Sequence, residues 1–398
     1  MNTICVIPAV FERYNIIPYC SSHAIVMFLV ASVRRARVRK VAAGAAAWRA
    51  RTLDLPHQAG SSASAFSSFS SSLPEREKMF YDALIVGGGP AGLSAAIRLK
   101  QLAADAGKEV SVCVVEKGSE IGAHILSGNV FETRALDELF PAWRTDKENP
   151  PPLTTKAGED RFLVLTGPTS SVPIPNFLLP PELHNHGNYI ISLSQLTRWL
   201  ANQAEALGVE IYPGFSASEV VYDSAGLRVL GIATKDAGIG KDGQLKDSFS
   251  RGVELLARQT LFAEGARGSC SEEIIAKFGL RQPGTHDVQS YGLGVKEVWQ
   301  VPADRFKAGY IQHTLGYPLQ SSPLSDVFGG SFLYHMEPNY VVLGMVVGLD
   351  YKNPYLSPYK EFQRWKHHPA VAEHLRGGEC ISYGARVLNE VGYHELEA

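Results

Sequence analysis

The sequence predicts an α/β fold in two parts, a Rossmann-like domain with a parallel sheet followed by a domain built on an antiparallel sheet. Two stretches predict it. Residues 81–116 read as strand, glycine turn, amphipathic helix and second strand. Residues 287–349 are dominated by alternating, aromatic-rich strands. A chain of 398 residues has room for two or three domains and for a sizeable core.

The first stretch carries a dinucleotide-binding fingerprint, GGGPAG. Gly87 permits the tight turn, Gly89 lets the backbone approach a pyrophosphate, and Gly92 lets the helix pack close to the strand. The start of the helix at 90–106 offers N–H groups and a positive dipole to phosphates. Glu116 ends the second strand, where an acid binds the hydroxyls of an unphosphorylated ribose. The alternative is a glycine-rich turn with no ligand.

Charge and cysteine content exclude several classes of function. The net charge of −2 provides no basic surface for nucleic acid. The five cysteines, at positions 5, 20, 113, 270 and 380, are far apart and form no CxxC pair. They therefore predict neither a disulfide framework nor a metal or cluster site within this chain, and we expect inert thiols.

Residues 1–74 do not read as part of the fold. They are rich in arginine and serine, with only Glu12 and Asp54 as acids. This composition is typical of a mitochondrial targeting peptide, and we expect a leader here. The apolar run 24–33 is too short to span a bilayer, which takes about 20 residues. A secretory signal and a misassigned first exon are the alternatives.

The segment after Glu116 contains a pliable loop at Gly122, Ser127 and Gly128, where the far end of a bound cofactor could rest against backbone. Apolar residues then continue to Trp143. The pattern permits a surface helix that covers the core. It also permits a helix lying in a membrane interface, with Trp143 at headgroup level.

Further elements complete the first domain. Prolines make residues 145–188 irregular, and a helix is predicted at 192–207. Strands are expected at 209–212, 219–222, 228–234 and 255–262, with a polar turn at 238–247. The segment FAEGARG then repeats the strand, glycine turn and helix order of the first stretch, with Gly265 and Gly268 between a strand and a helix. The alternative for this second glycine turn is an ordinary βα connection.

In the second domain, residues 336–339 predict a hairpin turn between apolar strands. Gly329 and Gly330 begin a strand and would allow close approach by a flat ring, although a β-bulge is an equal alternative. Residues 354–369 predict a basic, aromatic helix. Its adjacent His367 and His368 point in different directions, so we expect surface or capping roles rather than joint metal binding.

Long blocks of this sequence resemble the electron transfer flavoprotein–ubiquinone oxidoreductase family. They are YDALIVGGGPAGLSAAIRLK, GAHILSG, HGNYIISLSQL, QAEALGVEIYPGF, GIATKDAGIGKDG, FAEGARG, GGSFLYH and VVGLDYKNPYLSPYKEFQRWKHHP, within residues 79–389. The resemblance implies an FAD enzyme on the matrix side of the mitochondrial inner membrane. Such an enzyme takes electrons from reduced electron transfer flavoprotein and passes them to ubiquinone.

The resemblance also implies site residues. FAD contacts are expected at Gly87, Gly89, Pro90, Ala91, Gly92, Glu116, Lys117, Gly122, Ser127, Gly128, Val220, Gly265 and Gly268, and ubiquinone contacts at Gly329 and Gly330. A monotopic membrane contact is expected at 121–143. Because FAD carries the redox chemistry, no catalytic side chain and no metal ligand are predicted.

The predicted organisation is a leader (1–74), an FAD-binding domain (79–284), a ubiquinone-binding domain (285–375) and the start of a return to the FAD domain (376–398). The family pattern continues beyond GARVLNE into a further flavin segment and a domain with four cysteine ligands for a [4Fe–4S] cluster. Here VGYHELEA follows and the chain ends at Ala398, so we expect a truncated form without cluster ligands. The alternatives are a related flavin reductase with another apolar substrate, and a fragment that binds nucleotide or membrane without turnover.

Overall fold

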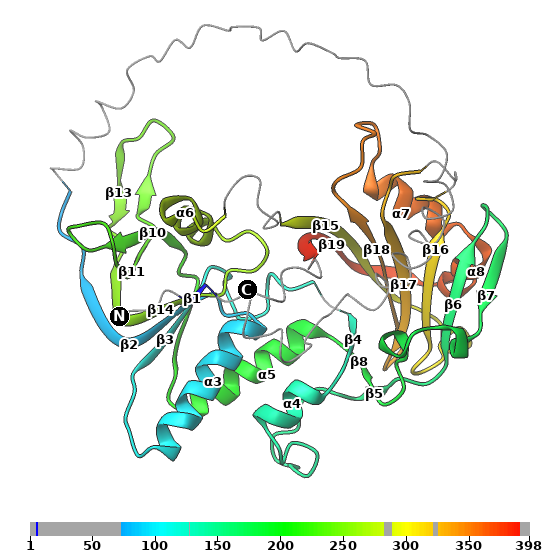
Figure 1. The fold of residues 1–398 in the computed structure, drawn as a ribbon, viewed down its shortest axis with the longest axis horizontal. Helices are drawn as coiled ribbons and strands as arrows, with labels where there is room; N and C mark the ends of the chain where they lie inside the picture. The colour runs from blue at the N-terminus through cyan, green and yellow to red at the C-terminus, as the bar shows by residue number, and fades with distance from the viewer. Residues whose placement is uncertain (1–4, 7–72, 127, 282–288, 321–324, 391–398) are drawn as a thin grey trace, which may run out of the picture.

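The computed structural model describes residues 5–6, 73–126, 128–281, 289–320 and 325–390. They form two lobes, each organised around one sheet, with helices α3 (Pro90–Asp105) and α5 (Leu193–Ala206) between and below them (Figure 1). Nearly all of the predicted leader, and residues 391–398, lie outside the described residues.

The first lobe contains a mostly parallel sheet. Its strand order is β10 (Ala217–Tyr222), β11 (Val229–Thr234), β14 (Glu254–Phe262), β2 (Lys78–Val86), β3 (Val112–Glu116) and β9 (Glu210–Pro213), and β1 (Cys5–Val6) pairs with β14. The four strands from β14 to β9 are parallel, whereas β10 and β11 pair antiparallel. The predicted α/β class and Rossmann-like domain are confirmed.

Helices cover both faces of this sheet because the central strands are apolar on both. Ile85 and Val114 point toward α3 and α5, whereas Leu84 and Cys113 point toward the opposite core beside α6 (Ser269–Phe278). Burial raises the pKa of the Cys113 thiol to about 12, and likewise that of Cys270. Both thiols therefore stay protonated at neutral pH.

The second lobe contains a mostly antiparallel sheet, as predicted. Its order is β19 (Glu379–Glu390), β15 (Ser290–Gln300), β18 (Tyr340–Gly348), β17 (Gly329–Met336), β16 (Ile311–Gly316), β6 (Asp160–Leu165) and β7 (Ser171–Ile174). Only β16 and β6 pair parallel among these neighbours. The turn between β17 and β18 occupies residues 337–339, where the hairpin was predicted.

Two segments join the second sheet although the sequence suggested other places for them. The proline-rich stretch 145–188 supplies β6 and β7, and Pro173 is accommodated because β7 is an edge strand. The same stretch supplies β5 (Thr155–Lys156), which joins β4 (Asn129–Phe131) and β8 (Tyr189–Ile191) in a small sheet, together with two short 3-10 turns, η3 (Asn176–Leu178) and η4 (Pro181–Leu183). Residues 379–390 form β19 at the other edge rather than a return to the first sheet.

The two faces of the second sheet differ. The outer face is covered by α7 (Pro358–Lys366) and α8 (Pro369–Leu375), with Phe362 and Trp365 fully buried. The predicted 354–369 helix thus ends early, and His368 caps α8 by accepting the N–H of Ala370 on Nδ1. The other face, hereafter the inner face, packs against β4 and β8; its apolar residues include Ile311, Phe332, Tyr334 and Val342.

In the first lobe, the predicted polar turn is a hairpin of β12 (Ala237–Ile239) and β13 (Leu245–Ser250).

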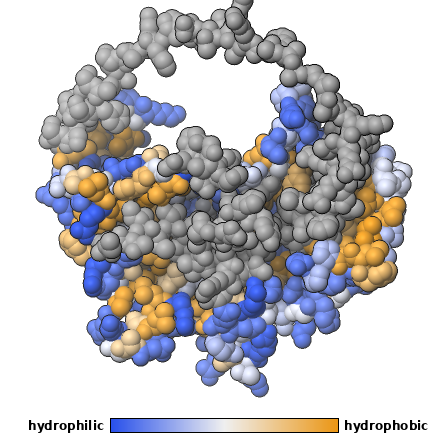
Figure 2. Space-filling view, in the orientation of Figure 1, coloured by the Kyte–Doolittle hydropathy of each residue, from blue (hydrophilic) through white to orange (hydrophobic). Residues whose placement is uncertain are grey.

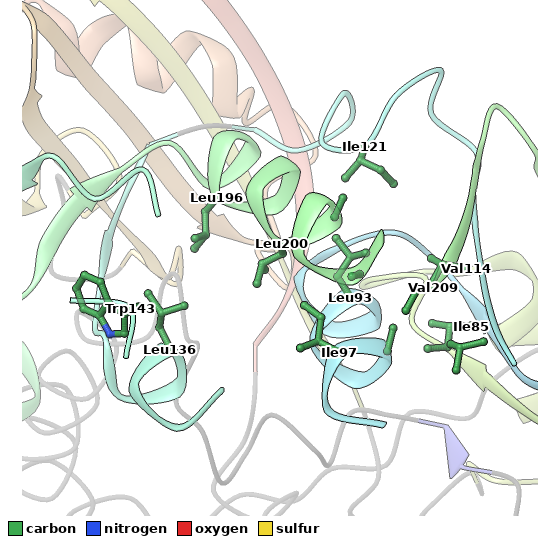
Figure 3. Packing of buried hydrophobic residues seen from close by; sticks show 14 of the residues in the cluster. Ile85, Leu93, Ile97, Val114, Ile121, Leu136, Trp143, Leu196, Leu200 and Val209 are labelled. Carbon is green, nitrogen blue, oxygen red and sulfur yellow. The ribbon is translucent and has the colours of Figure 1, made fainter. Parts of the chain in front are cut away.

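The stretch 121–143 packs into the first core. Ile121, Leu136 and Trp143 are each at most 8% exposed and join the cluster around α3 and α5 (Figure 3). Trp143 also donates its indole N–H to Asp137, on the short helix α4 (Arg134–Leu139). The expected membrane contact of these side chains is therefore wrong, and the core-covering alternative describes them. Among the described residues, no helix is long and apolar enough to cross a bilayer.

Candidate functional site

The turn between β2 and α3 combines two glycines that the backbone requires with one that faces open space. Gly87 has φ +112°, and a Cβ there would overlap the carbonyl O of Ala263. A Cβ at Gly92 would overlap the carbonyl O of Gly87. At Gly89, in contrast, a Cβ would meet no atom within 4 Å. The backbone before α3 is thus open to a ligand.

The first turn of α3 places uncapped N–H groups, with their partial positive charge, beside this glycine turn. Gly89 is the N-cap, Pro90 occupies the first turn, and no side chain caps the helix. The first N–H groups of a helix have no intrahelical acceptor and carry partial positive charge. Pro90 and Ala91 are half-buried, so this end of the helix is not enclosed by the core. It suits a phosphate anion.

The second glycine turn lies directly beside the first. The N–H of Ala263 donates to the carbonyl O of Val86 at 2.8 Å. Gly265 has φ +81°, and a Cβ there would meet no atom within 4 Å. Gly268 has a different role, because a Cβ there would overlap the side chain of Glu264, whose carboxylate accepts the N–H of Ser271 at the start of α6. Only Gly265 of this pair therefore faces open space.

Glu116 lies at the carboxyl end of β3 beside the first turn. One carboxylate oxygen accepts the N–H of Gly88 at 3.0 Å, and the other accepts the N–H of Gly118 at 2.7 Å. The Glu116 side chain is 15% exposed, with Nδ1 of His124 at 3.9 Å. Each carboxylate oxygen has further lone pairs, which can accept hydrogen bonds from hydroxyl groups.

The other predicted FAD positions have varied surroundings. Lys117 is exposed next to Glu116, whereas the side chain of Val220 is buried in the core beneath β10. Gly122 lies against α5, since a Cβ added there would be 2.8 Å from the carbonyl O of Ser194. Gly128 lies against Val342 of β18. Ser127 is outside the described residues. Gly122 thus contacts an element of the first lobe, whereas Gly128 contacts the second sheet.

Packing within the second sheet is enough to explain why Gly329 and Gly330, the predicted ubiquinone contacts, are glycines. A Cβ at Gly329 would overlap the carbonyl O of Val346, and one at Gly330 would be 2.9 Å from Cδ2 of Leu315. These contacts fit the close approach of neighbouring strands. Contact of the pair with a flat ring stays a prediction.

The inner face also carries polar side chains that sequence reasoning missed. Lys296 of β15 is 7% exposed, and desolvation lowers the pKa of its amine to about 7. His313 and Tyr334 share a buried hydrogen bond of 2.8 Å, and burial lowers the pKa of the histidine and raises that of the tyrosine. A single lysine within the apolar strand GLGVKEVWQV was the available signal.

Comparisons with known proteins agree with this architecture. Residues 291–388 match the family described as ETF-QO, ubiquinone-binding, and residues 85–150 match an NAD(P)-binding Rossmann-like domain. The chain is 54% identical over 321 residues to the mitochondrial electron transfer flavoprotein-ubiquinone oxidoreductase of Arabidopsis thaliana, covering 81% of this chain and 48% of that protein. Against the Pseudomonas aeruginosa protein of the corresponding name it is 53% identical over 323 residues, covering 81% of this chain and 57% of that one.

The chain spans about half the length of the curated relatives that it matches. Among solved structures, a geranylgeranyl bacteriochlorophyll reductase-like protein from Thermoplasma acidophilum is similar, with a TM-score of 0.51 and 14% identity. The similarity covers 78% of this chain and 66% of that chain. At this identity it shows a shared fold.

Proposed function

Because this chain is related over about four-fifths of its length to electron transfer flavoprotein–ubiquinone oxidoreductases, we propose that it binds FAD and reduces ubiquinone with electrons from reduced electron transfer flavoprotein. The observation that carries the proposal is the pair of adjacent glycine turns. Gly89 and Gly265 both face open space, and the carboxylate of Glu116 lies beside the first turn.

The residues present fit an FAD molecule. Gly89 and the start of α3 would hold the pyrophosphate, Glu116 would accept hydrogen bonds from the adenosine ribose, and Gly265 would admit the cofactor on its other side. When bound, FAD supplies the electron-transfer chemistry. The chain's own groups bind the cofactor, orient it and exclude water from the ring.

The inner face of the second sheet supports the quinone part of the proposal. Phe332, Tyr334 and Val342 form a buried apolar and aromatic cluster there. Ubiquinone has a flat ring and a hydrocarbon tail, so a site for it needs apolar and aromatic side chains of this kind. We place the ring beside the Gly329–Gly330 end of β17, where the strand carries no side chains.

A membrane contact is proposed at a different place from the one the sequence suggested. Val172, Phe177 and Leu178 are 50%, 81% and 65% exposed, within seven positions of one another. Hydrophobic residues gather at the right-hand edge of the molecule, beside β7 (Figure 2). Exposed apolar side chains of this kind lower their free energy by entering a lipid surface. With the basic, serine-rich leader, they support a location on the mitochondrial inner membrane.

An iron–sulfur cluster does not fit the described cysteines. Cys113 and Cys270 are buried in the core of the first lobe and Cys380 lies in β19 of the second, whereas a [4Fe–4S] cluster takes four cysteine ligands at one site. Within the described ranges, no group of three or more histidine, cysteine or acidic side chains could hold a metal ion. No step of the proposed reaction is therefore assigned to a cluster in this chain.

The experiment measures flavin absorbance of the purified chain, then reduction of a short-chain ubiquinone analogue with reduced electron transfer flavoprotein as donor. Bound FAD with quinone reduction supports the full proposal. Bound FAD reduced by the donor, but inert toward ubiquinone analogues, would indicate a related flavin reductase with another acceptor. A chain that takes up no FAD after reconstitution would contradict the proposal and indicate a fragment without turnover.

A further inference from the structure

Lys296 connects the two lobes at the inner face of the second sheet. Its Nζ donates to the carbonyl O of Gly128 at 3.1 Å, across 168 positions of sequence. The same Nζ lies 5.5 Å from the ring centroid of Phe332, two residues beyond the Gly329–Gly330 pair. The amine therefore lies between the loop that follows Glu116 and the strand proposed to meet the quinone.

The neighbouring strands make room for this arrangement. Lys296 is paired with Gly344 on β18 and with Gly384 on β19. The space above Gly344 is filled by the ring of Phe332, which would be 2.5 Å from a Cβ there. The space above Gly384 is filled by Leu126, whose Cδ1 would be 2.9 Å from a Cβ. Two glycines thus let an aromatic ring and the loop pack on either side of one buried lysine.

The loop itself is anchored at several carbonyls. Arg386 of β19 donates to the carbonyl O of His124, and Arg198 of α5 donates to that of Ile121 at 3.2 Å. At the beginning of the segment, Glu116 holds the N–H of Gly118. The chain from the ribose-binding acid to the second sheet is therefore fixed at both ends, and Lys296 is its buried anchor.

We propose that Lys296 is a positioning residue for the flavin, which holds Gly128 on the inner face and places a positive charge beside the backbone where the far end of FAD is expected. The inference rests on the proposed FAD function. Its consequence is that Lys296 favours reduced over oxidised flavin, since a cation in a buried setting stabilises the added negative charge.

The surroundings of the amine support this role. The contacts of the amine include those with the carbonyl O of Gly128 and the ring of Phe332, and its paired residues on the adjacent strands are Gly344 and Gly384. Desolvation is the cause of the lowered pKa of Lys296. Such an amine gains a proton readily when negative charge arises nearby.

The test compares the full chain with Lys296→Met, Lys296→Gln and Lys296→Arg, each reconstituted with FAD. The readouts are the FAD dissociation constant and the two-electron midpoint potential of the bound flavin. The matched control is Lys100→Met, because Lys100 also donates to a backbone carbonyl, that of Val110, at 3.1 Å, but on α3. The Gln variant decides the question if the Met variant does not fold.

We expect Met and Gln to reduce the preference for reduced flavin at least tenfold, a fall of about 30 mV in the midpoint potential. Arg should retain most of the preference, and Lys100→Met should change neither readout. An unchanged potential in folded, FAD-bound Met and Gln variants would overturn the role of Lys296 while leaving the FAD function intact. Failure of the unaltered chain to bind FAD would instead overturn the proposed function and, with it, this inference.

Discussion

The carboxylate of Glu116 accepts the N–H of Gly88 at 3.0 Å, so the acid at the end of β3 is tied to the glycine turn after β2. The contact spans the first βαβ crossover and orients the carboxylate next to the start of α3. A ribose bound to Glu116 and a pyrophosphate bound at Gly89 would then be neighbours, as a dinucleotide requires.

Glu116→Gln should weaken FAD binding by about 10- to 100-fold, because hydrogen bonds to a charged acceptor contribute about 1.5–3 kcal/mol. The amide also donates where the carboxylate only accepts, which disturbs the bonds from Gly88 and Gly118. Flavin fluorescence titration measures the effect. Glu361→Gln, which removes a helix-surface pair with Arg364, is the control and should leave the affinity unchanged. Equal FAD affinities for the unaltered chain, Glu116→Gln and Glu361→Gln would rule out the ribose role of Glu116.

Gly92→Ala should destabilise the first lobe by about 1–3 kcal/mol, because overpacking of a tight contact forces the backbone to shift. The added methyl would overlap the carbonyl O of Gly87. Urea unfolding monitored by circular dichroism gives the free energy of unfolding. Gly158→Ala is the matched control, since its Cβ would lie at an ordinary 3.4 Å from the nearest atom. A Gly92→Ala protein as stable as the control would contradict this packing.

Acid should destabilise the second lobe through a buried histidine pair. Nδ1 of His335 accepts the N–H of Lys307, so Nε2 of His335 carries the proton and donates to Nδ1 of His374 at 3.0 Å. Desolvation lowers the pKa of His335 to about 3 and also lowers that of His374. The unfolded chain, with histidine pKa values near 6.5, therefore binds more protons below that pH.

The stabilisation is thus present above about pH 6.5 and is lost as pH falls toward 3, and for His335 the loss is about 1 kcal/mol between pH 6 and 5. Urea unfolding at several pH values measures the slope. His335→Gln should flatten it in this window, with His184→Gln, an exposed histidine, as the control. A slope identical in both variants would show that His335 is not the group responsible.

Phe177→Ser with Leu178→Ser should reduce binding to vesicles that contain anionic lipid, because together these residues expose the largest apolar side chains near β7. Co-sedimentation with vesicles measures the bound fraction, and we expect a loss of at least tenfold. Leu102→Ser, at an exposed apolar position on α3, is the control and should bind like the unaltered chain. Unchanged vesicle binding by the double variant would contradict a membrane contact at Phe177 and Leu178.

The parts of the fold that local pattern determines were predicted well. The apolar runs of β2 and β3, the glycines between them and the helix period of α3 lie within one short stretch, so sequence alone indicates their arrangement. The antiparallel hairpin of β17 and β18 is local in the same way. The roles of individual site residues depend on more distant contacts, and their assignment to FAD and ubiquinone stays a proposal.

Long-range pairing explains what the sequence did not reveal. Strands β6 and β7 lie in a proline-rich stretch, and they are strands only because β16, far along the chain, pairs with β6. Trp143 looked suited to a membrane surface, but its burial depends on the packing of α4 against the first core. Lys296 gave no local sign of its contact with Gly128, since that contact exists only when the two lobes are assembled.

The most direct test of FAD binding across the two glycine turns is Gly89→Leu. Gly89 has φ −82° and open space at its Cβ position, so leucine is compatible with the chain alone but would occupy the proposed pyrophosphate site. We predict that flavin absorbance is lost while the thermal midpoint of the FAD-free protein stays within about 2 °C of that of the unaltered protein, a difference of at most about 2 kcal/mol for a chain of this size. A Gly89→Leu protein that retains stoichiometric FAD would contradict the central claim.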